Sequence, residues 1–123
     1  MSLLARHHTP KGMDTPAFCR PPDATPRLAV VGVLGVEPQV AVRDAIRQTW
    51  LPRGAAANML ALFVLRGIGL APATHAELHT HGDIVLLRAE AVQSRLVGPL
   101  WSAWLWLECA MHAWPTAQLI GSV

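Results

Sequence analysis

Two short, continuous runs of apolar residues constrain the fold of this chain more than any other feature. They span residues 28–34 (LAVVGVL) and 58–65 (NMLALFVL), and each ends at a glycine or at an Arg-Gly step. Runs of this length without polar alternation are typical of strands that are covered on both faces, as in a parallel sheet. The pattern therefore predicts two strands of an α/β fold, one on each side of an intervening helical segment.

The rest of the chain continues this alternation of helix and strand. Residues 37–51 predict a helix in which Pro38 fits the first turn and Pro52 ends the pattern. One face of that helix holds four residues at helical spacing: Val42, Ala45, Ile46 and Thr49. Later elements are expected as a short polar helix over 74–79, a strand over 83–87, a long helix over 91–114 with a candidate break at Gly98-Pro99, and a strand over 117–121. This is the order of a doubly wound, Rossmann-like sheet with flanking helices.

Composition places the chain among folded, single-domain proteins. Its 123 residues fit one domain, and 52% hydrophobic against 15% charged residues excludes a disordered chain. Residues 1–26 are rich in proline and show no periodicity, so they are expected to form a flexible leader to a domain over 27–123. A net charge of +2 without a dense basic stripe argues against a nucleic-acid partner.

No membrane segment or targeting signal is expected from the sequence. The longest apolar stretch covers residues 96–107 and contains Pro99, whereas a helix needs roughly 20 apolar residues to cross a bilayer. Charged residues recur through the first 27 positions, so no signal or anchor is visible there. The two cysteines, Cys19 and Cys109, are far apart, and their disulfide state is left open.

The most specific sequence features are two strings that flank the predicted second strand. They are RDAIRQTW at residues 43–50 and E-x3-HGDI at residues 77–84. In order and spacing they resemble the R-x-A-I-R-x-T-W helix and the E-x3-Y-G-D-I strand entry of the β-1,3-galactosyltransferase-like hexosyltransferases. The resemblance covers about residues 27–123. It implies a GT-A-type, mostly parallel sheet, truncated, of which this chain is the N-terminal, donor-nucleotide half.

The resemblance also implies a reaction, a metal and a location. The family transfers a hexose from a UDP-sugar to a hydroxyl of a glycan or glycoconjugate acceptor, with Mn2+ on an Asp-Asp-Asp-type motif, in the Golgi membrane. Residues 118–123 resemble the strand before that motif, and the motif itself does not occur before the sequence ends. The expectation is therefore a fragment without a catalytic residue or a metal ligand, inactive by itself. A non-catalytic nucleotide-binding or interaction module is the alternative.

Three residues are candidate contacts to the donor nucleotide: Arg43, Arg47 and Asp83. The two arginines lie four positions apart, so both project from one side of a helix toward a phosphate or a carboxylate. The plainer alternative is a solvated face, or pairing with Asp44 or Glu37. The resemblance implies that Asp83 lies near the nucleotide side of the sheet, and a turn or cap role is its alternative.

Two other groups of residues have competing interpretations. His75 and His79, with His81 as a third ligand, form a candidate zinc site on the short helix, against the plainer interpretation of an exposed polar helix. Trp50 is expected to anchor the core. The indole-rich long helix is apolar nearly all round, so it is expected to be buried in the core or in an interface, and a second copy of the chain is a candidate partner.

Overall fold

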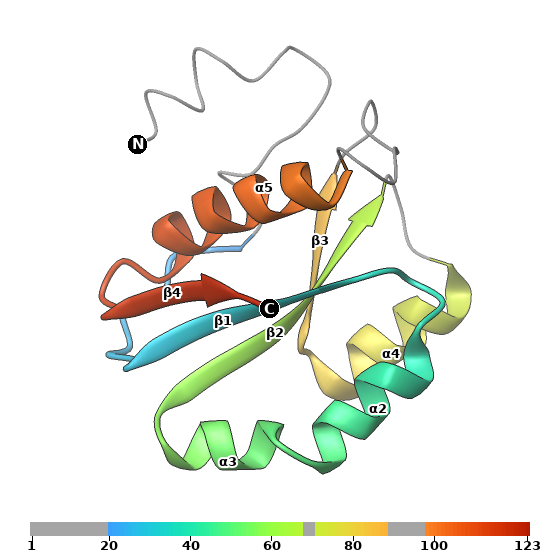
Figure 1. Cartoon of the computed structure of the whole chain (residues 1–123), viewed down its shortest axis with the longest axis horizontal. Helices are drawn as coiled ribbons and strands as arrows, with labels where there is room; N and C mark the ends of the chain where they lie inside the picture. The colour runs from blue at the N-terminus through green and yellow to red at the C-terminus, as the bar shows by residue number, and fades with distance from the viewer. Residues whose placement is uncertain (1–19, 68–70, 89–97) are drawn as a thin grey trace.

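Four parallel strands run through the centre of the described part of the protein (Figure 1). The computed structural model describes residues 20–67, 71–88 and 98–123. The strands are β1 (Ala29–Gly35), β2 (Met59–Gly67), β3 (Ile84–Arg88) and β4 (Leu119–Ser122). They lie in the order β3-β2-β1-β4, and each neighbouring pair is parallel. The α/β class and the parallel sheet that the sequence predicts are confirmed.

Helices cover both faces of this sheet. Helix α5 (Gly98–Ala113) lies across one face, whereas α2 (Val40–Gln48), α3 (Leu51–Ala56) and α4 (Pro72–His81) lie on the other (Figure 1). The chain passes from β1 outward to β2 and β3, and then returns through α5 to place β4 on the other side of β1. The strand order therefore reverses between β1 and β4. In open parallel sheets, ligands bind at the carboxyl ends of the strands beside such a reversal.

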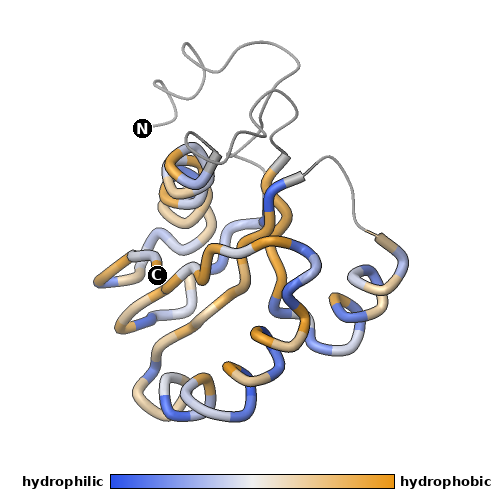
Figure 2. The backbone as a smooth tube through the Cα atoms, turned by 45° about the vertical axis from the view of Figure 1, so that its right-hand side comes forward, coloured by the Kyte–Doolittle hydropathy of each residue, from blue (hydrophilic) through white to orange (hydrophobic). Residues whose placement is uncertain are grey.

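The core consists of one apolar cluster on each face of the sheet. Successive strand residues point to opposite faces, so Leu62 and Val64 pack under α5 whereas Phe63 and Leu65 pack on the side of α2 and α4. The cluster under α5 is completed by the inner face of that helix: Leu105, Trp106, Cys109, Ala110 and Ala113. In Figure 2 the hydrophobic colour follows the central strands. Burial on both faces explains why these strands lack polar alternation.

Three prolines mark the starts of helices. Pro72 is the first residue of α4, and Pro52 and Pro99 are the second residues of α3 and α5. Proline suits the first turn because the N–H that it lacks has no partner within the helix there. The helix predicted over 37–51 is present as α2, but its predicted end is wrong, because α2 stops at Gln48 and a separate helix, α3, starts at Leu51. Pro52 lies in the first turn of this second helix instead of ending the first.

Residues 20–26, which the sequence assigns to a flexible leader, are hydrogen-bonded to the domain. The backbone N–H of Asp23 donates to the carbonyl oxygen of Ala113 at 2.6 Å. The guanidinium of Arg20 donates to the carbonyl oxygens of Gly82 and Ile84 at 3.2 and 3.3 Å. These contacts join the segment before β1 to the C-terminal end of α5 and to the entry of β3. Residues 1–19, and residues 91–97 of the predicted long helix, lie outside the described residues.

The packing of α5 on the sheet depends on Gly32, in the middle of β1. A Cβ atom on Gly32 would lie 2.6 Å from Nε1 of the Trp106 indole, closer than real Cβ contacts allow. The same indole nitrogen donates a hydrogen bond of 2.8 Å to the carbonyl oxygen of Gly121 in β4. Trp106 is fully buried, so its only polar atom is satisfied by the neighbouring strand. The indole therefore lies directly on β1 and ties α5 to the edge strand.

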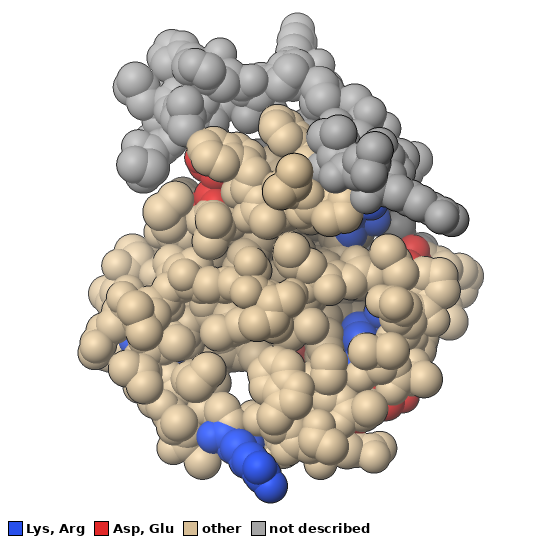
Figure 3. All heavy atoms as spheres, viewed as in Figure 1, with Lys and Arg blue, Asp and Glu red and all other residues tan. Residues whose placement is uncertain are grey.

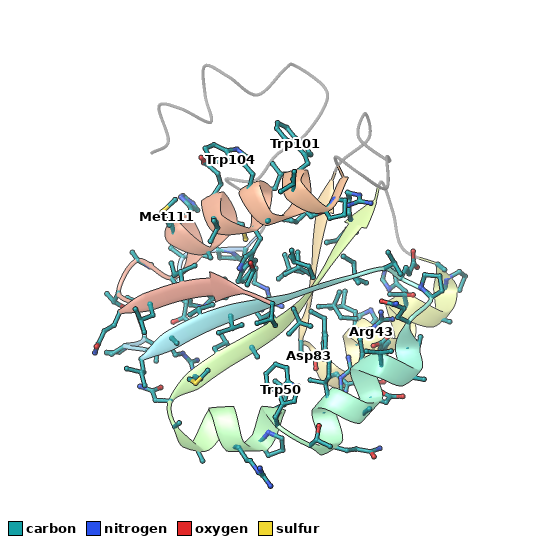
Figure 4. The ribbon with its side chains drawn as sticks, viewed as in Figure 1. Arg43, Trp50, Asp83, Trp101, Trp104 and Met111 are labelled. Carbon is teal, nitrogen blue, oxygen red and sulfur yellow. The ribbon has the colours of Figure 1, made fainter. Side chains whose placement is uncertain are left out.

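The inner face of α5 is buried in the core, whereas its outer face is exposed and apolar, so burial of that face in an interface stays a prediction. Four large apolar side chains at helical spacing face away from the sheet: Leu100, Trp104, Leu107 and Met111. Trp104 extends from the side of α5 opposite the sheet in Figure 4, whereas Trp101 is partly buried and packs against the core cluster. Trp50 is also 37% exposed, at the junction of α2 and α3, so its predicted role as a core anchor is wrong. No helix in the described ranges has the length and apolar character to span a membrane.

We expect Gly32→Ala to destabilise the protein and Gly121→Ala to be tolerated. The new methyl at position 32 meets the indole of Trp106, and forcing it into the core costs about 1–3 kcal/mol of the free energy of unfolding. At Gly121 a Cβ atom meets nothing within 4 Å, so the matched change removes no packing. Denaturant titration of both variants measures the difference. Equal losses of stability in the two variants would contradict this account of the α5 contact.

Candidate functional site

Four residues from the two sequence motifs meet in one ion-pair cluster between α2, α4 and the entry of β3. Arg43 and Arg47 come from α2, Glu77 from α4, and Asp83 from the residue before β3. Arg43 donates from Nε and Nη2 to the two carboxylate oxygens of Glu77, at 2.7 and 2.8 Å. This two-bond arrangement is the strong form of an arginine–carboxylate pair. In Figure 4, Arg43 lies between α2 and α4, and Asp83 lies below the strands on the same side of the sheet.

Arg47 joins the second half of the cluster to the first. Its Nε and Nη2 donate to the two carboxylate oxygens of Asp83 at 2.8 and 2.7 Å, and Nη2 also donates to Glu77 at 2.8 Å. Nη1 donates to Asp44 at 2.9 Å. The guanidinium carbon lies 4.9 Å from the centre of the Phe63 ring, a cation–π contact with the floor of the sheet. All three nitrogens of Arg47 are therefore engaged within the protein.

The cluster turns the arginine side of α2 toward the sheet. Val42, on the apolar face that the sequence indicates, is 52% exposed, whereas Arg43 is only 3% exposed. Ile46 is the one member of that apolar face that packs in the core. Buried cations are tolerated when they are paired and hydrogen-bonded, and Glu77 and Asp83 supply the opposite charges. The solvated face considered for Arg43 and Arg47 is therefore not what α2 presents.

The charges in this cluster hold one another in the ionised state. Hydrogen bonds from Arg43 lower the pKa of Glu77 from its ordinary 4.5 to about 2, against the opposing effect of burial and with a further contribution from Arg47. The hydrogen bond to Asp83 raises the pKa of Arg47 above its already high ordinary value, again against burial. Neither side chain exchanges protons near neutral pH, so the cluster serves structure rather than acid–base chemistry.

Arg43 also fixes the turn that follows β1. Its Nη1 donates to the carbonyl oxygen of Val36 at 3.0 Å, and its Nη2 donates to that of Glu37 at 2.7 Å. The side chain of Glu37 in turn accepts a hydrogen bond of 2.5 Å from the backbone N–H of Ala71, at the start of α4. The turn lies at the carboxyl end of β1, which is the edge of the sheet where ligands of this fold class bind. Arg43 therefore holds in place the turn at the carboxyl end of β1.

Asp83 lies at the opposite ends of the strands, their amino ends, which form the amino edge of the sheet. It precedes β3, and β3 is parallel to β2 and β1, so Asp83 is at the amino ends of the strands. Arg47, near the end of α2, reaches the same edge to pair with it. The geometry thus differs from the expectation that Asp83 lies on the nucleotide side of the sheet. Asp83 has a structural role instead, as an ion-pair partner that fastens β3 to α2 and not as the turn or cap residue considered as the alternative.

A small cavity of about 130 Å3 opens at the carboxyl edge, beside the turn that Arg43 holds. It is lined by the end of β1 and the turn after it, the end of β2 and the first turns of α5: Leu34, Gly35, Val36, Arg66, Pro99 and Ser102. Arg66 donates from Nη1 to the hydroxyl of Ser102 at 3.0 Å. Ser102 is 5% exposed. This cavity has the position expected for a donor nucleotide, and the positively charged guanidinium of Arg66 is part of its lining.

Arg66 and Ser102 were not identified from the sequence as site residues. Arg66 stands in the Arg-Gly step that marks the end of the second apolar run, and that step was interpreted only as a strand ending. Ser102 is a single polar residue within an apolar helix, without a motif around it. Their separation of 36 positions makes the contact a product of the fold, so only the alternation of strand residues, which turns Arg66 toward α5, carries a signal for it.

A larger cavity, of about 520 Å3, lies at the amino edge of the sheet. Its polar lining comes from the segment before β1 and the entry to β3: Arg20, Asp23, Arg27, His81 and Asp83. Its volume lies in the range of ordinary ligand pockets. The carboxylates offset the arginines, however, and Asp83 is already paired with Arg47. Because this fold class binds ligands at the carboxyl ends of its strands, we assign the candidate site to the smaller cavity.

The histidines of α4 do not gather into a metal site in the described ranges. The rings of His75 and His79 lie side by side with centroids 5.3 Å apart, as their spacing predicts, and both are exposed. Glu77 points instead into the ion-pair cluster. Within residues 20–67, 71–88 and 98–123, no three His, Cys, Asp or Glu side chains are grouped so as to hold a metal ion. We therefore assign no ligand for zinc or for the Mn2+ that the resemblance implies.

Charged side chains are few on the face of the molecule seen in Figure 3, and the arginines there stand apart from one another.

Comparison with known proteins assigns no family to the chain. No protein-family model matches the chain, and no curated protein sequence matches it. The interpretation of the site therefore depends on its geometry and on the two motifs.

We expect Glu77→Gln to remove a large part of the acid sensitivity of the fold. Because the pKa of Glu77 is about 2 in the folded protein and 4.5 ordinarily, ionised Glu77 stabilises the fold above pH 4.5. This contribution, about 3 kcal/mol, is lost as the pH falls from 4.5 toward 2. The variant should be less stable than the native chain at pH 7, by a similar amount, and should lack this loss. Unfolding free energies between pH 7 and pH 2.5 measure both effects.

Asp44→Asn is the matched control for this experiment. Its side chain is 50% exposed and contacts Arg47 from the next turn of α2. Exposed pairs of this kind contribute about 0–1 kcal/mol, so the pH dependence of this variant should follow that of the native chain. If Glu77→Gln keeps the native pH dependence between 4.5 and 2.5, the buried pair is not the source of the acid sensitivity.

Proposed function

We propose that this chain is the donor-nucleotide half of a hexosyltransferase similar to the β-1,3-galactosyltransferases, and that it binds a UDP-sugar at the carboxyl edge of its sheet. The observation that carries the proposal is that the charged residues of the two motifs pair with one another in the fold. RDAIRQTW and E-x3-HGDI are about 30 residues apart in the sequence, and their charged residues are one another's partners in the fold. Their order, spacing and pairing fit a single inherited unit.

The position of this unit beside the sheet supports a nucleotide site. Arg43 holds the turn after β1, and that turn forms a wall of the 130 Å3 cavity. The strand order reverses between β1 and β4, at the same edge. A parallel sheet presents backbone groups and helix starts to a phosphate at this place, and the chain adds Arg66 as a cation. The motif resemblance implies a UDP-sugar as the substrate, and a cavity with an arginine at this end of the sheet suits its diphosphate.

One observation favours the alternative of an interaction module. The outer face of α5 exposes an apolar stripe, made of Leu100, Trp104, Leu107 and Met111. Exposed apolar stripes on a helix are typical of contact surfaces between proteins. An interaction module without a nucleotide site would show no affinity for UDP, so the binding experiment below separates the two functions.

We expect the chain to bind UDP, and to bind ADP at least tenfold more weakly because the base is read as well as the phosphates. Isothermal titration calorimetry measures both affinities. Arg43→Lys should weaken UDP binding about tenfold, because lysine keeps the charge beside Glu77 but loses the fork that also holds the turn carbonyls. The matched change Arg47→Lys lies toward the amino edge, and UDP affinity should stay within twofold.

The comparison of the two lysine variants decides whether the motif serves the site or only the fold. Equal weakening of UDP binding by both would assign the cluster to general stability. Absence of UDP binding to the native chain would overturn the proposed function and leave the interaction module as the better account.

A further inference from the structure

We propose that Arg66, oriented by Ser102, binds a phosphoryl group of the donor's diphosphate in the cavity at the carboxyl edge. The inference rests on the proposed function for the nucleotide, but the anion site itself follows from the charges around the cavity. Arg66 differs in this respect from the arginines of the ion-pair cluster.

Arg66 is a partly buried cation without an opposite charge among the described residues. Within residues 20–67, 71–88 and 98–123 its one hydrogen bond is the 3.0 Å contact from Nη1 to the uncharged hydroxyl of Ser102. Its Nε is fully buried and has no partner in the described part of the chain. By contrast, Arg43 and Arg47 make short ion pairs with Glu77 and Asp83. A guanidinium offers five N–H donors, so most of the capacity of Arg66 is unused.

Among the residues that the structure describes, none that lines the cavity beside Arg66 carries a carboxylate. Its lining is apolar or neutral apart from the guanidinium: Leu34, Gly35, Val36, Pro99 and Ser102. A partly buried charge without compensation is costly, and an anion in the cavity removes that cost. A volume of about 130 Å3 suits a phosphoryl group and is too small for a whole nucleotide, whose base and sugar would extend outside it.

The register of the strands explains why this cation faces the cavity. Arg66 follows Leu62 and Val64 at alternate positions of β2, so it points to the same face as they do, toward α5. There it meets Ser102, which lies one helical turn before Trp106 and on the same side of α5. The fork of the guanidinium matches the oxygens of a phosphate, and the hydroxyl of Ser102 holds the fork in place.

Calorimetric titration of the whole chain with inorganic pyrophosphate, UDP and uridine tests the proposal. Arg66→Met should weaken the binding of pyrophosphate and of UDP by about 10- to 100-fold, as expected for lost hydrogen bonds to a charged group. Its affinity for uridine should stay unchanged. Arg53→Met, which removes an exposed arginine of α3, is the matched control and should leave all three affinities as they are. Ser102→Ala should weaken pyrophosphate binding less than Arg66→Met does.

The outcomes separate this inference from the proposed function. If pyrophosphate binds through Arg66 but UDP binds no better than pyrophosphate, the phosphoryl site stands and the nucleotide function fails. If Arg66→Met binds UDP and pyrophosphate as the native chain does, the phosphoryl site is overturned while the nucleotide function stands. A thermal melt checks that the variants fold. Should Arg66→Met fail to fold, Arg66→Lys takes its place, and unchanged pyrophosphate affinity in both Arg66→Lys and Ser102→Ala overturns the inference.

Discussion

The buried ion pairs of Arg43 and Arg47 with Glu77 and Asp83 are the interaction on which the rest of one face depends. They join α2 to α4, fasten α2 to the entry of β3, and hold the turn after β1 through two backbone carbonyls. Breaking such a pair leaves a buried charge without compensation, which costs more than the pair contributes when it is intact. Loss of one member of the cluster therefore leaves its partner charge uncompensated and destabilises this face of the sheet.

The sequence predicted the sheet well because strands buried on both faces leave a direct pattern in it. The runs over 28–34 and 58–65 became β1 and β2 with bounds shifted by at most two residues at either end. The end of α2 at Gln48 and the separate helix α3 were not predicted, since Pro52 is equally consistent with ending one helix and with lying in the first turn of another. The direction in which α2 faces was also missed. Periodicity identifies an apolar side, but not the carboxylates elsewhere in the chain that draw the arginine side inward.

The candidate site was predicted in its motifs and missed in its geometry. Arg43, Arg47 and Asp83 were singled out as contacts to the donor nucleotide, and the ion pair between Arg47 and Asp83 was not predicted. For the arginines, Glu37 and Asp44, the nearest carboxylates in sequence, were the partners considered. Asp44 does contact Arg47, but the close partners of the cluster lie 30 or more residues away. Arg66 was not predicted as a site residue, because strand alternation indicates the face to which it points but not the partner that it meets there. Contacts that the fold creates between single residues are beyond what local pattern can indicate.

The absence of a side chain at Gly32 has an effect that reaches beyond local packing. The Trp106 indole occupies the space over β1 and thereby sets how near to the sheet, and in which rotation, α5 can lie. Ser102 belongs to the same rigid helix, one turn closer to the carboxyl edge, and is the residue that meets Arg66. The position of the Ser102 hydroxyl therefore depends on the absence of a Cβ atom at Gly32, in the middle of β1. A larger residue at position 32 would shift α5, and with it Ser102, and would so change the shape of the cavity without altering any residue that lines it.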